Sequence, residues 1–267
     1  MPNSRVAIVT GAASGIGRAM ASGLMAAGYQ VAAVDRDTEG LAGLRAAQTL
    51  TADLAEQGAC SKVVEAVRAK FGRIDILVNN AGIGQPALRP DQRTNPLRFW
   101  QINRTQWQNF LAINATAPLM MARAVAPQMM AAGRGRIVTV TTSLGTMIRP
   151  GYILYGASKA AAEAACAIMA GDLAGSGVTS NVLVPGGVTD TALVSDYTAE
   201  ERQHMLRPGI MVPPLLWLVS DAAAEVNGRR FLAAHWDTKL PPDEAAKAAG
   251  APIAWTELAT MPIEPAG

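Results

Sequence analysis

The chain has 267 residues, 50% of them hydrophobic and 16% charged, which is typical of a globular core and excludes a disordered chain. Its net charge is only +2 and the basic residues are scattered, so it lacks the concentrated positive charge of a nucleic-acid-binding protein. Two cysteines are too few for a disulfide scaffold or a four-ligand zinc site, and they indicate a reducing compartment.

Short β-branched runs alternate with helical patterns along the chain. Runs of this kind suit strands that are buried on both faces; they span residues 6–10, 31–34, 74–78, 137–141 and 178–184. Helical spacing between them covers residues 15–27, 57–71 and 105–130. Such alternation predicts right-handed βαβ units, and hence an α/β fold with a doubly wound parallel sheet and helices on both faces.

Three connections are unusually long, at residues 82–104, 144–153 and 186–212. Each follows a strand, so we expect them at the carboxyl edge of the sheet, where open α/β sheets bind ligands, as walls of a substrate pocket. We predict one domain over residues 1–237, with cofactor and substrate sites together, and a proline-rich C-terminal tail over residues 238–267.

We expect the chain to carry no targeting signal and no membrane anchor. Its first residues lead straight into a strand, and its most apolar late stretch, residues 210–219, is short and interrupted by two prolines. Neither histidine has carboxylate or cysteine neighbours at metal-ligand spacing. We therefore expect a cytoplasmic protein with no membrane segment and no metal site.

A glycine-rich turn follows the first strand and opens the first helix, with the sequence GAASGIG at residues 11–17. Glycines allow a tight turn and a close approach of backbone N–H groups to a pyrophosphate, which the positive end of the helix stabilises. This context predicts a dinucleotide site that includes Gly11, Ser14, Gly15, Ile16 and Gly17.

Acidic residues end the next two strands. Asp35 lies eighteen residues past Gly17, where a carboxylate accepts hydrogen bonds from both ribose hydroxyls of NAD and repels a 2′-phosphate. Arg36 softens that repulsion, but Ser14 offers a phosphate no positive charge, so NAD is favoured over NADP. Asp53, beside Leu54, either binds the adenine amine or caps a turn.

Tyr155 and Lys159 lie four residues apart at the start of an alanine-rich helical pattern, so both side chains can point into one cleft. A phenol titrates near pH 10, too high for a general base at neutral pH. At about 5 Å and an effective dielectric of about 20, an ammonium attracts a phenolate by about 3 kcal/mol, or about two pKa units. We therefore predict that Lys159 makes Tyr155 a base that works near pH 7 to 8.

Together these motifs resemble the short-chain dehydrogenase/reductase family over about residues 5–234. The resemblance rests on TGAASGIG at 10–17, NNAG at 79–82, Asn114, the Tyr155/Lys159 pair and PGGV at 185–188, in the family's order and spacing. It implies a Rossmann-type sheet of seven strands in the order 3-2-1-4-5-6-7, a nicotinamide cofactor, and a homodimer or homotetramer.

The resemblance also implies residue roles. Tyr155 exchanges the substrate proton, Lys159 also holds the nicotinamide ribose, and Asn114 continues a proton relay through water. The cofactor site gains three further groups of residues; they are Asn80, Ala81 and Gly82, then Tyr155 and Lys159, and then Pro185, Gly186, Val188, Thr189 and Thr191.

Two positions depart from the family's pattern. Thr142 occupies the place of the usual serine, thirteen residues before the tyrosine, and side-chain alternation along the strand leaves either Thr142 or Ser143 to polarise the substrate oxygen. The segment after Pro185 is one residue longer than usual, so either Thr189 or Thr191 reaches the nicotinamide carboxamide.

We expect an oxidoreductase that transfers a hydride between NAD(H) and a secondary alcohol or ketone. The apolar residues of the long loops favour a moderately hydrophobic, cyclic or aromatic substrate. The alternatives are an NADPH-dependent 3-oxoacyl-type ketoreductase and a non-catalytic dinucleotide-binding protein.

Overall fold

The computed structural model describes residues 5–89, 91–194 and 197–258. Within these residues the strands form one eight-stranded sheet in the order β3-β2-β1-β4-β5-β6-β7-β8. The strands are β1 (Val6–Thr10), β2 (Gln30–Asp35), β3 (Gln48–Thr51), β4 (Ile76–Asn79), β5 (Gly135–Val140), β6 (Val178–Val184), β7 (Arg229–Leu232) and β8 (Gly250–Pro252). The first seven are parallel, which confirms the predicted doubly wound fold and strand order.

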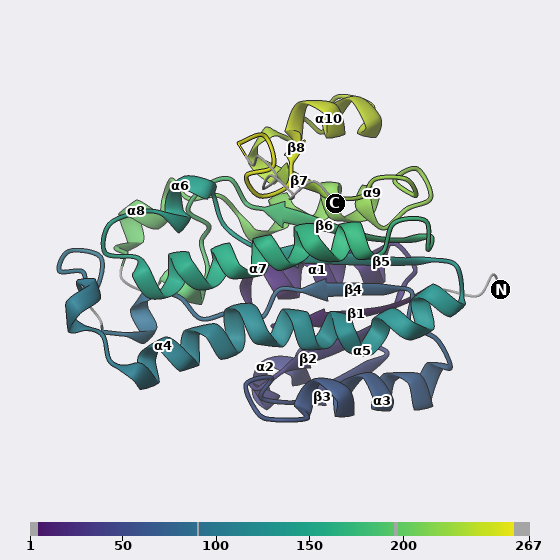
Figure 1. Ribbon diagram of the computed structural model, residues 1–267, viewed down its shortest axis with the longest axis horizontal. Coiled ribbons are helices and arrows are strands. Elements are labelled where there is room, and N and C mark those ends of the chain that lie inside the picture. The colour runs from purple at the N-terminus through teal and green to yellow at the C-terminus, as the bar shows by residue number, and fades with distance from the viewer. Residues whose placement is uncertain (1–4, 90, 195–196, 259–267) are drawn as a thin grey trace, which may run out of the picture.

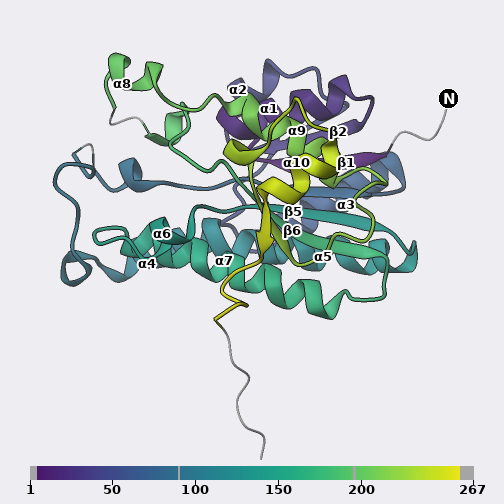
Figure 2. The same cartoon turned by 90° about the horizontal axis from the view of Figure 1, so that it is seen from above.

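Helices cover both faces of the sheet (Figures 1 and 2). One face carries α1 (Gly15–Ala26), α2 (Thr38–Ala42) and α9 (Val212–Leu218), and the other carries α3 (Ala59–Phe71), α5 (Ala117–Ala131) and α7 (Ile153–Asp172). A hydrophobic core lies on each face of the sheet, and alternate side chains of β1 pack into them. Ala7 and Val9 lie on the α1 side, and Val6 and Ile8 lie on the α3 side. Burial on both faces explains why β1, β2, β4, β5 and β6 read as largely apolar runs, whereas the polar edge strand β3 does not.

The long middle helical pattern is interrupted by a π-helical turn. Helix α4 (Arg104–Leu111) passes through η3 (Ala112–Thr116) into α5, and the amide of Ala117 donates to the carbonyl of Ala112, five residues back. Turns of this kind are frequent at functional sites.

Two helical segments, 104–131 and 153–172, are long and apolar enough to cross a membrane by length and composition alone. Both belong to the helical layer that packs on the sheet, and 39% and 44% of their apolar windows are buried inside the protein. Packing within the domain accounts for their apolar character, so these segments are weak evidence for a membrane span.

The three long connections gather at the carboxyl edge of the sheet, at the left of Figure 1, as expected. They contain α6 (Leu144–Met147), α8 (Ala199–Gln203) and several short 3₁₀ turns. The predicted site residues lie at this same edge of the sheet.

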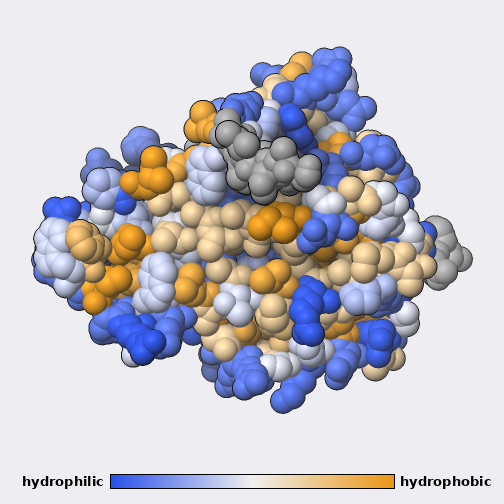
Figure 3. Space-filling model, viewed as in Figure 1, coloured by the Kyte–Doolittle hydropathy of each residue, from blue (hydrophilic) through white to orange (hydrophobic). Residues whose placement is uncertain are grey.

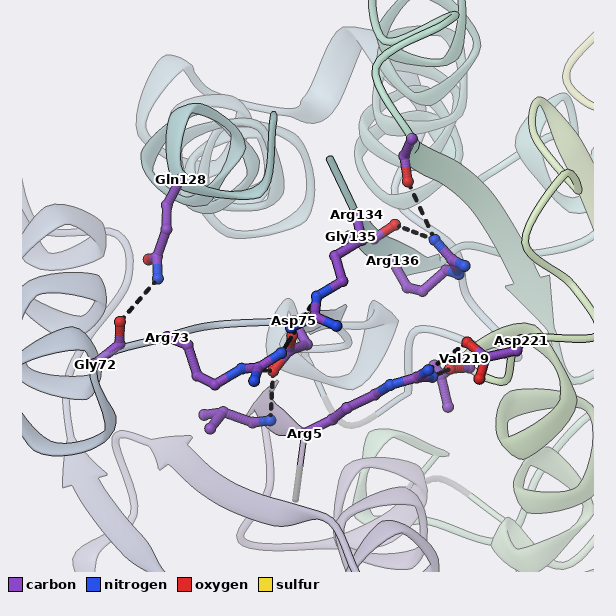
Figure 4. Close-up of polar contacts among 12 residues, drawn as sticks. Arg5, Gly72, Arg73, Asp75, Gln128, Arg134, Gly135, Arg136, Val219 and Asp221 are labelled. Carbon is purple, nitrogen blue, oxygen red and sulfur yellow. Dashed lines mark hydrogen bonds and ion pairs between the residues drawn. The ribbon is translucent and has the colours of Figure 1, made fainter. Parts of the chain in front are cut away.

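Polar contacts hold the opposite, amino edge of the sheet (Figure 4). The buried carboxylate of Asp75 accepts hydrogen bonds from the Val6 amide (2.9 Å) and from Nε of Arg73 (2.8 Å), and Arg134 lies 3.7 Å away. Arg5 bonds to Asp221 and to the Val219 carbonyl. These contacts join the starts of β1, β4 and β5 to the end of α9.

Part of the predicted tail is integrated into the domain. Helix α10 (Pro242–Ala249) packs on α9 and β7, and β8 pairs antiparallel with β7, adding one strand to the expected seven. Burial of three alanines of α10 and of Ile253 drives this docking. A three-residue strand is too short to give a periodic signal in the sequence. The part of the tail beyond residue 258 lies outside the described residues.

Candidate active site

The glycine-rich turn between β1 and α1 is built as its sequence predicts. Gly11 and Gly15 have positive φ angles of 67° and 52°, which side chains rarely adopt. A Cβ on Gly17 would lie 2.0 Å from the carbonyl oxygen of Gly11, so no side chain fits there. The turn brings bare backbone close to the cleft.

The amino end of α1 is suited to an anion. Ser14 is exposed at the N-cap and its side chain makes no capping hydrogen bond, while Ile16 packs against the core. The first-turn amides of this twelve-residue helix therefore carry the positive end of the helix dipole without a side-chain cap. A pyrophosphate meets these requirements.

Asn80 and Ala81 continue the site at the end of β4. The Asn80 side chain donates to the carbonyls of Thr10 (3.0 Å) and Gly11 (3.3 Å), so it clamps the glycine turn. The hydroxyl of Thr10 accepts from both the Asn80 and Ala81 amides. Thr10 was not among the predicted site residues, although it opens the glycine motif and its position before Gly11 could have drawn attention to it.

Asp35 lies at the carboxyl end of β2, beside the glycine turn. Its Oδ2 accepts from the Ala13 amide (3.0 Å) and its Oδ1 from the Asp37 amide (3.1 Å), which fixes the carboxylate at the mouth of the cleft. Arg36 is exposed. The structure therefore provides the acidic residue at the position that the sequence indicated.

Asp53 and Leu54 follow β3. Asp53 accepts from the Ala55 amide (2.9 Å), so the turn-capping role is present in the structure, while binding of adenine stays a prediction. Leu54 is buried in the core on the α3 side.

The segment after β6 places the two candidate threonines in different surroundings. Pro185 accepts from the Ala234 amide, Gly186 has a φ of 90°, and the side chain of Val188 is largely exposed. Thr189 is buried and donates to the Gly187 carbonyl (3.3 Å). Thr191 instead packs directly against the glycine turn, because a Cβ on Gly15 would lie 2.9 Å from its methyl group.

Leu193 brings this segment into contact with the loop after β4. A Cβ on Gly84 would lie 2.8 Å from Cγ of Leu193, so the segment after β6 touches the loop after β4. Arg93 and Glu201 form an ion pair of 3.1 Å between the same two loops. The two loops therefore contact each other at the carboxyl edge of the sheet, where they were expected to wall a substrate pocket.

Tyr155 and Lys159 lie on the face of α7 that looks toward the strand ends, together with Asn114. The Lys159 ammonium donates to the Val140 carbonyl (3.0 Å), and Asn114 donates to the Ile83 carbonyl and to the Ser158 hydroxyl (both 3.0 Å). Gly82 sits between them, since a Cβ there would lie 3.1 Å from Oδ1 of Asn114 and 3.4 Å from Nζ of Lys159. The π turn in the middle helix carries Asn114 to this point.

The predicted pKa of Tyr155 is wrong for the protein by itself. Burial raises the pKa of the Tyr155 phenol to about 12, only partly opposed by a hydrogen bond with Thr142, and Lys159 is not among the groups that lower it. The same enclosure lowers the pKa of Lys159 to about 8. Desolvation therefore outweighs the attraction between ammonium and phenolate that a solvent-exposed pair would show.

The structure separates the two candidate hydroxyls. The Thr142 side chain lies beside Tyr155 and lowers the pKa of its hydroxyl. Ser143 is instead the N-cap of α6, where its hydroxyl accepts from the Thr146 amide (3.3 Å) and pairs with the Thr146 hydroxyl (2.7 Å). The geometry thus puts Thr142 with the tyrosine and gives Ser143 a structural task.

This division of labour predicts unequal effects of two substitutions. Thr142→Val should lower kcat/KM about 100-fold, because one donor to the substrate oxygen is lost, while Thr142→Ser should keep most activity. Ser143→Ala should leave kcat near that of the wild type and cost about 1 kcal/mol of stability through the lost cap. Steady-state rates and thermal denaturation check both; a larger activity loss in Ser143→Ala would reverse the assignment.

Comparisons with known proteins agree with this geometry. The family model for short chain dehydrogenases matches residues 5–202. D-threitol dehydrogenase of Mycolicibacterium smegmatis is 34% identical over 244 residues, which cover 85% of this chain and 90% of that protein.

Two solved structures show the same fold. The 3-ketoacyl-(acyl-carrier-protein) reductase from Brucella melitensis, complexed with NADH, superimposes with a TM-score of 0.74 at 27% identity, over 85% of this chain and 95% of that one. A protein from Beutenbergia cavernae, described as an NAD(P)-dependent gluconate 5-dehydrogenase with bound NADP, gives a TM-score of 0.73 at 33% identity, over 87% and 96%. The chain belongs to the short-chain dehydrogenase family. It is an oxidoreductase of the class that binds NAD or NADP.

Proposed function

We propose that this protein uses NAD(H) to interconvert a secondary alcohol and its ketone. The observation that carries the proposal is the convergence of Tyr155, Thr142 and Lys159 at the carboxyl edge of the sheet, next to the glycine turn. A non-catalytic dinucleotide-binding protein has no need for a buried lysine and a desolvated phenol at that place.

The residues present fit a nicotinamide dinucleotide. The glycine turn has no room for a Cβ on Gly17, and the uncapped amides of α1 suit the pyrophosphate. Asp35 would hold the adenosine ribose and Lys159 the nicotinamide ribose. When bound, the dinucleotide would take a hydride from the alcohol carbon or return it to the ketone carbon.

The chain's own residues handle the proton. With a pKa of about 12, Tyr155 is protonated at neutral pH, so it donates its proton to the ketone oxygen during reduction and must accept one during oxidation. Thr142 donates a hydrogen bond to the same oxygen. Asn114, which donates to Ser158 on the same helix as Tyr155, would together with Lys159 support a route for the proton to solvent.

The preference for NAD rests on Asp35. Its carboxylate is fixed by two backbone amides, so it cannot turn away from a 2′-phosphate. We expect NADH to bind at least about 10-fold more tightly than NADPH, and Asp35→Ser to remove most of the difference, because a repulsion of about 1.4 kcal/mol changes affinity 10-fold. Titrations followed by tryptophan fluorescence measure both affinities without any substrate. Equal affinities in the wild type would refute the role given to Asp35.

The substrate we favour is a moderately hydrophobic, cyclic or aromatic alcohol, because apolar side chains stand in the loops at this edge, with Leu193 packed against Gly84 and Met147 buried. A polyol is the second candidate, since the similar protein of M. smegmatis is a D-threitol dehydrogenase. A 3-oxoacyl ketoreductase is the third, given the similar Brucella structure. A panel of these three substrate classes, followed by NADH absorbance in both directions, distinguishes them; no turnover of any class would count against the proposal.

We also infer that the chain forms a homodimer or homotetramer through the face of α5 and α7. Figure 3 shows a broad apolar band over this face, and Leu119, Met130 and Ile168 are among its exposed side chains. Apolar areas of this extent mark interfaces. Light scattering measures the molar mass; a monomer at micromolar concentration would refute the inference. We expect the assembly to work in the cytoplasm and to bind neither nucleic acid nor membrane.

A further inference from the structure

A buried carboxylate lies one step beyond the active-site pair on α7. Tyr155, Lys159 and Glu163 follow one another at four-residue intervals, so they share one face of the helix. Glu163 is fully buried. Its Oε2 accepts from the Thr141 hydroxyl (2.6 Å), and its Oε1 accepts from Nε of Arg230 (2.8 Å).

The arginine of this pair reaches the catalytic threonine. Arg230, on β7, is itself buried, and its Nη2 donates to the backbone carbonyl of Thr142 (3.0 Å). Thr142 is the residue whose side chain lies beside Tyr155 and lowers the pKa of its hydroxyl. The guanidinium therefore links the Glu163 carboxylate to the peptide that carries the active-site hydroxyl, with the fork geometry that lysine lacks.

The C-terminal segment is fastened to the same carboxylate. Oε1 of Glu163 also accepts from the Ala254 amide (3.2 Å), and Ala254 has a φ of 54°, in the left-handed region that non-glycine residues rarely occupy. Ile253 next to it is buried against Cys166 and Val184. A strained residue is kept where surrounding contacts fix it, and here the carboxylate supplies one of those contacts.

A buried charge pair is costly unless it is fully hydrogen-bonded, and replacement by apolar residues of similar volume is often neutral for stability. Stability alone therefore does not explain why this pair stands behind the active site. Its four contacts share one property: they connect α7, the end of β5, β7 and the segment after β8 at a single point.

We propose that Glu163 and Arg230 are positioning residues that hold the Thr142 backbone so that its hydroxyl meets Tyr155. The inference rests on the proposed alcohol and ketone chemistry for its kinetic consequence, but its geometric core concerns the protein alone. A residue with a purely structural role would affect unfolding and leave the Thr142 to Tyr155 contact unchanged.

Two variants test the proposal in the full chain. Arg230→Lys keeps the charge beside Glu163 but loses the second arm toward Thr142. Glu163→Leu combined with Arg230→Met removes both charges and keeps the volume. Retained NADH binding shows that each variant is folded. Arg73→Met combined with Asp75→Leu makes the same kind of change at the opposite edge of the sheet and serves as the matched control.

The first readout needs no substrate. The ¹³Cζ resonance of Tyr155, one of only four tyrosines and assigned with Tyr155→Phe, reports the hydrogen bond of its hydroxyl at neutral pH. We expect it to move in both variants, in the same direction as in Thr142→Val, and to stay in place in the control. An unmoved resonance in Arg230→Lys and in the double variant overturns the proposal.

The second readout is kinetic. We expect kcat to fall about 10- to 100-fold with KM nearly unchanged, since a misplaced group costs rate more than binding. Wild-type kcat in both variants also overturns the proposal. If the wild type turns over none of the substrate classes, the proposed function fails, while the Tyr155 resonance still decides whether Glu163 and Arg230 position Thr142.

Discussion

Tyr155→Phe is expected to lower kcat/KM about 10²- to 10⁴-fold in both directions, the range for loss of a positioned general acid or base. The hydroxyl is the only proton-bearing atom removed, and the ring keeps its packing, so NADH affinity should remain that of the wild type. Initial rates by NADH absorbance, together with fluorescence titration of NADH, measure the two quantities. Tyr29→Phe, half-buried near the turn between α1 and β2, is the control. Turnover at the wild-type rate would refute the mechanism.

The raised pKa of Tyr155 gives this prediction a pH dependence. The phenol stays protonated up to about pH 12, so ketone reduction has its proton available throughout the neutral range. Alcohol oxidation requires the minor, deprotonated form, and its kcat/KM should therefore rise with pH between 7 and 10. The slope belongs to the tyrosine and lysine together, because neighbouring groups titrate as a unit. An oxidation rate that falls over this pH range would contradict the assignment.

Lys159→Met is expected to abolish most activity and yet stabilise the folded protein at pH 7. Burial lowers the pKa of Lys159 from 10.5 to about 8, so the charged form costs the folded state about 3 kcal/mol at neutral pH. The substitution also removes the hydrogen bond from Lys159 to the Val140 carbonyl, which reduces the gain in stability by about 1 kcal/mol. We therefore expect a net gain of about 2 kcal/mol, measured by urea denaturation at pH 7.

The sign of the linkage makes this result testable at a second pH. Between about pH 8 and 10.5 the unfolded wild type binds a proton that the folded wild type has lost, so the wild type gains stability as pH rises. The advantage of Lys159→Met should therefore shrink by pH 10. Lys62→Met, on the exposed side of α3, is the control and should change neither quantity. If Lys159→Met were less stable than the wild type at pH 7, burial of the charged Lys159 would not destabilise the folded protein.

Much of the molecule follows from local sequence signals. The β-branched runs predicted β1, β2, β4, β5 and β6, because those strands are buried on both faces, whereas β3 and β7 carry no such run. The glycine pattern predicted the turn between β1 and α1, because Gly11 and Gly15 have positive φ angles and Gly17 has no room for a Cβ. The position of Asp35 at the end of β2 was predicted from its distance from the glycine turn. These features depend on neighbours in sequence or on which residue types fit a turn, and both can be read from the sequence.

The remainder depends on enclosure by distant segments. The pKa of Tyr155 is set by how much protein surrounds the phenol, which the spacing of two residues does not reveal. Likewise, the choice between Thr142 and Ser143 needed the start of α6, and Glu163 acquired its partners only when β7 and the segment after β8 were in place. Long-range desolvation and pairing are the properties that periodicity leaves undetermined.

The π turn at Ala112–Thr116 makes the middle helix equivalent to an unbroken α-helix carrying one inserted amino acid. Deleting a single residue inside the turn would restore ordinary winding and rotate Asn114 away, while both flanking helices kept their lengths. A single insertion or deletion in this turn would therefore be enough to bring the Asn114 amide to the site or to take it away.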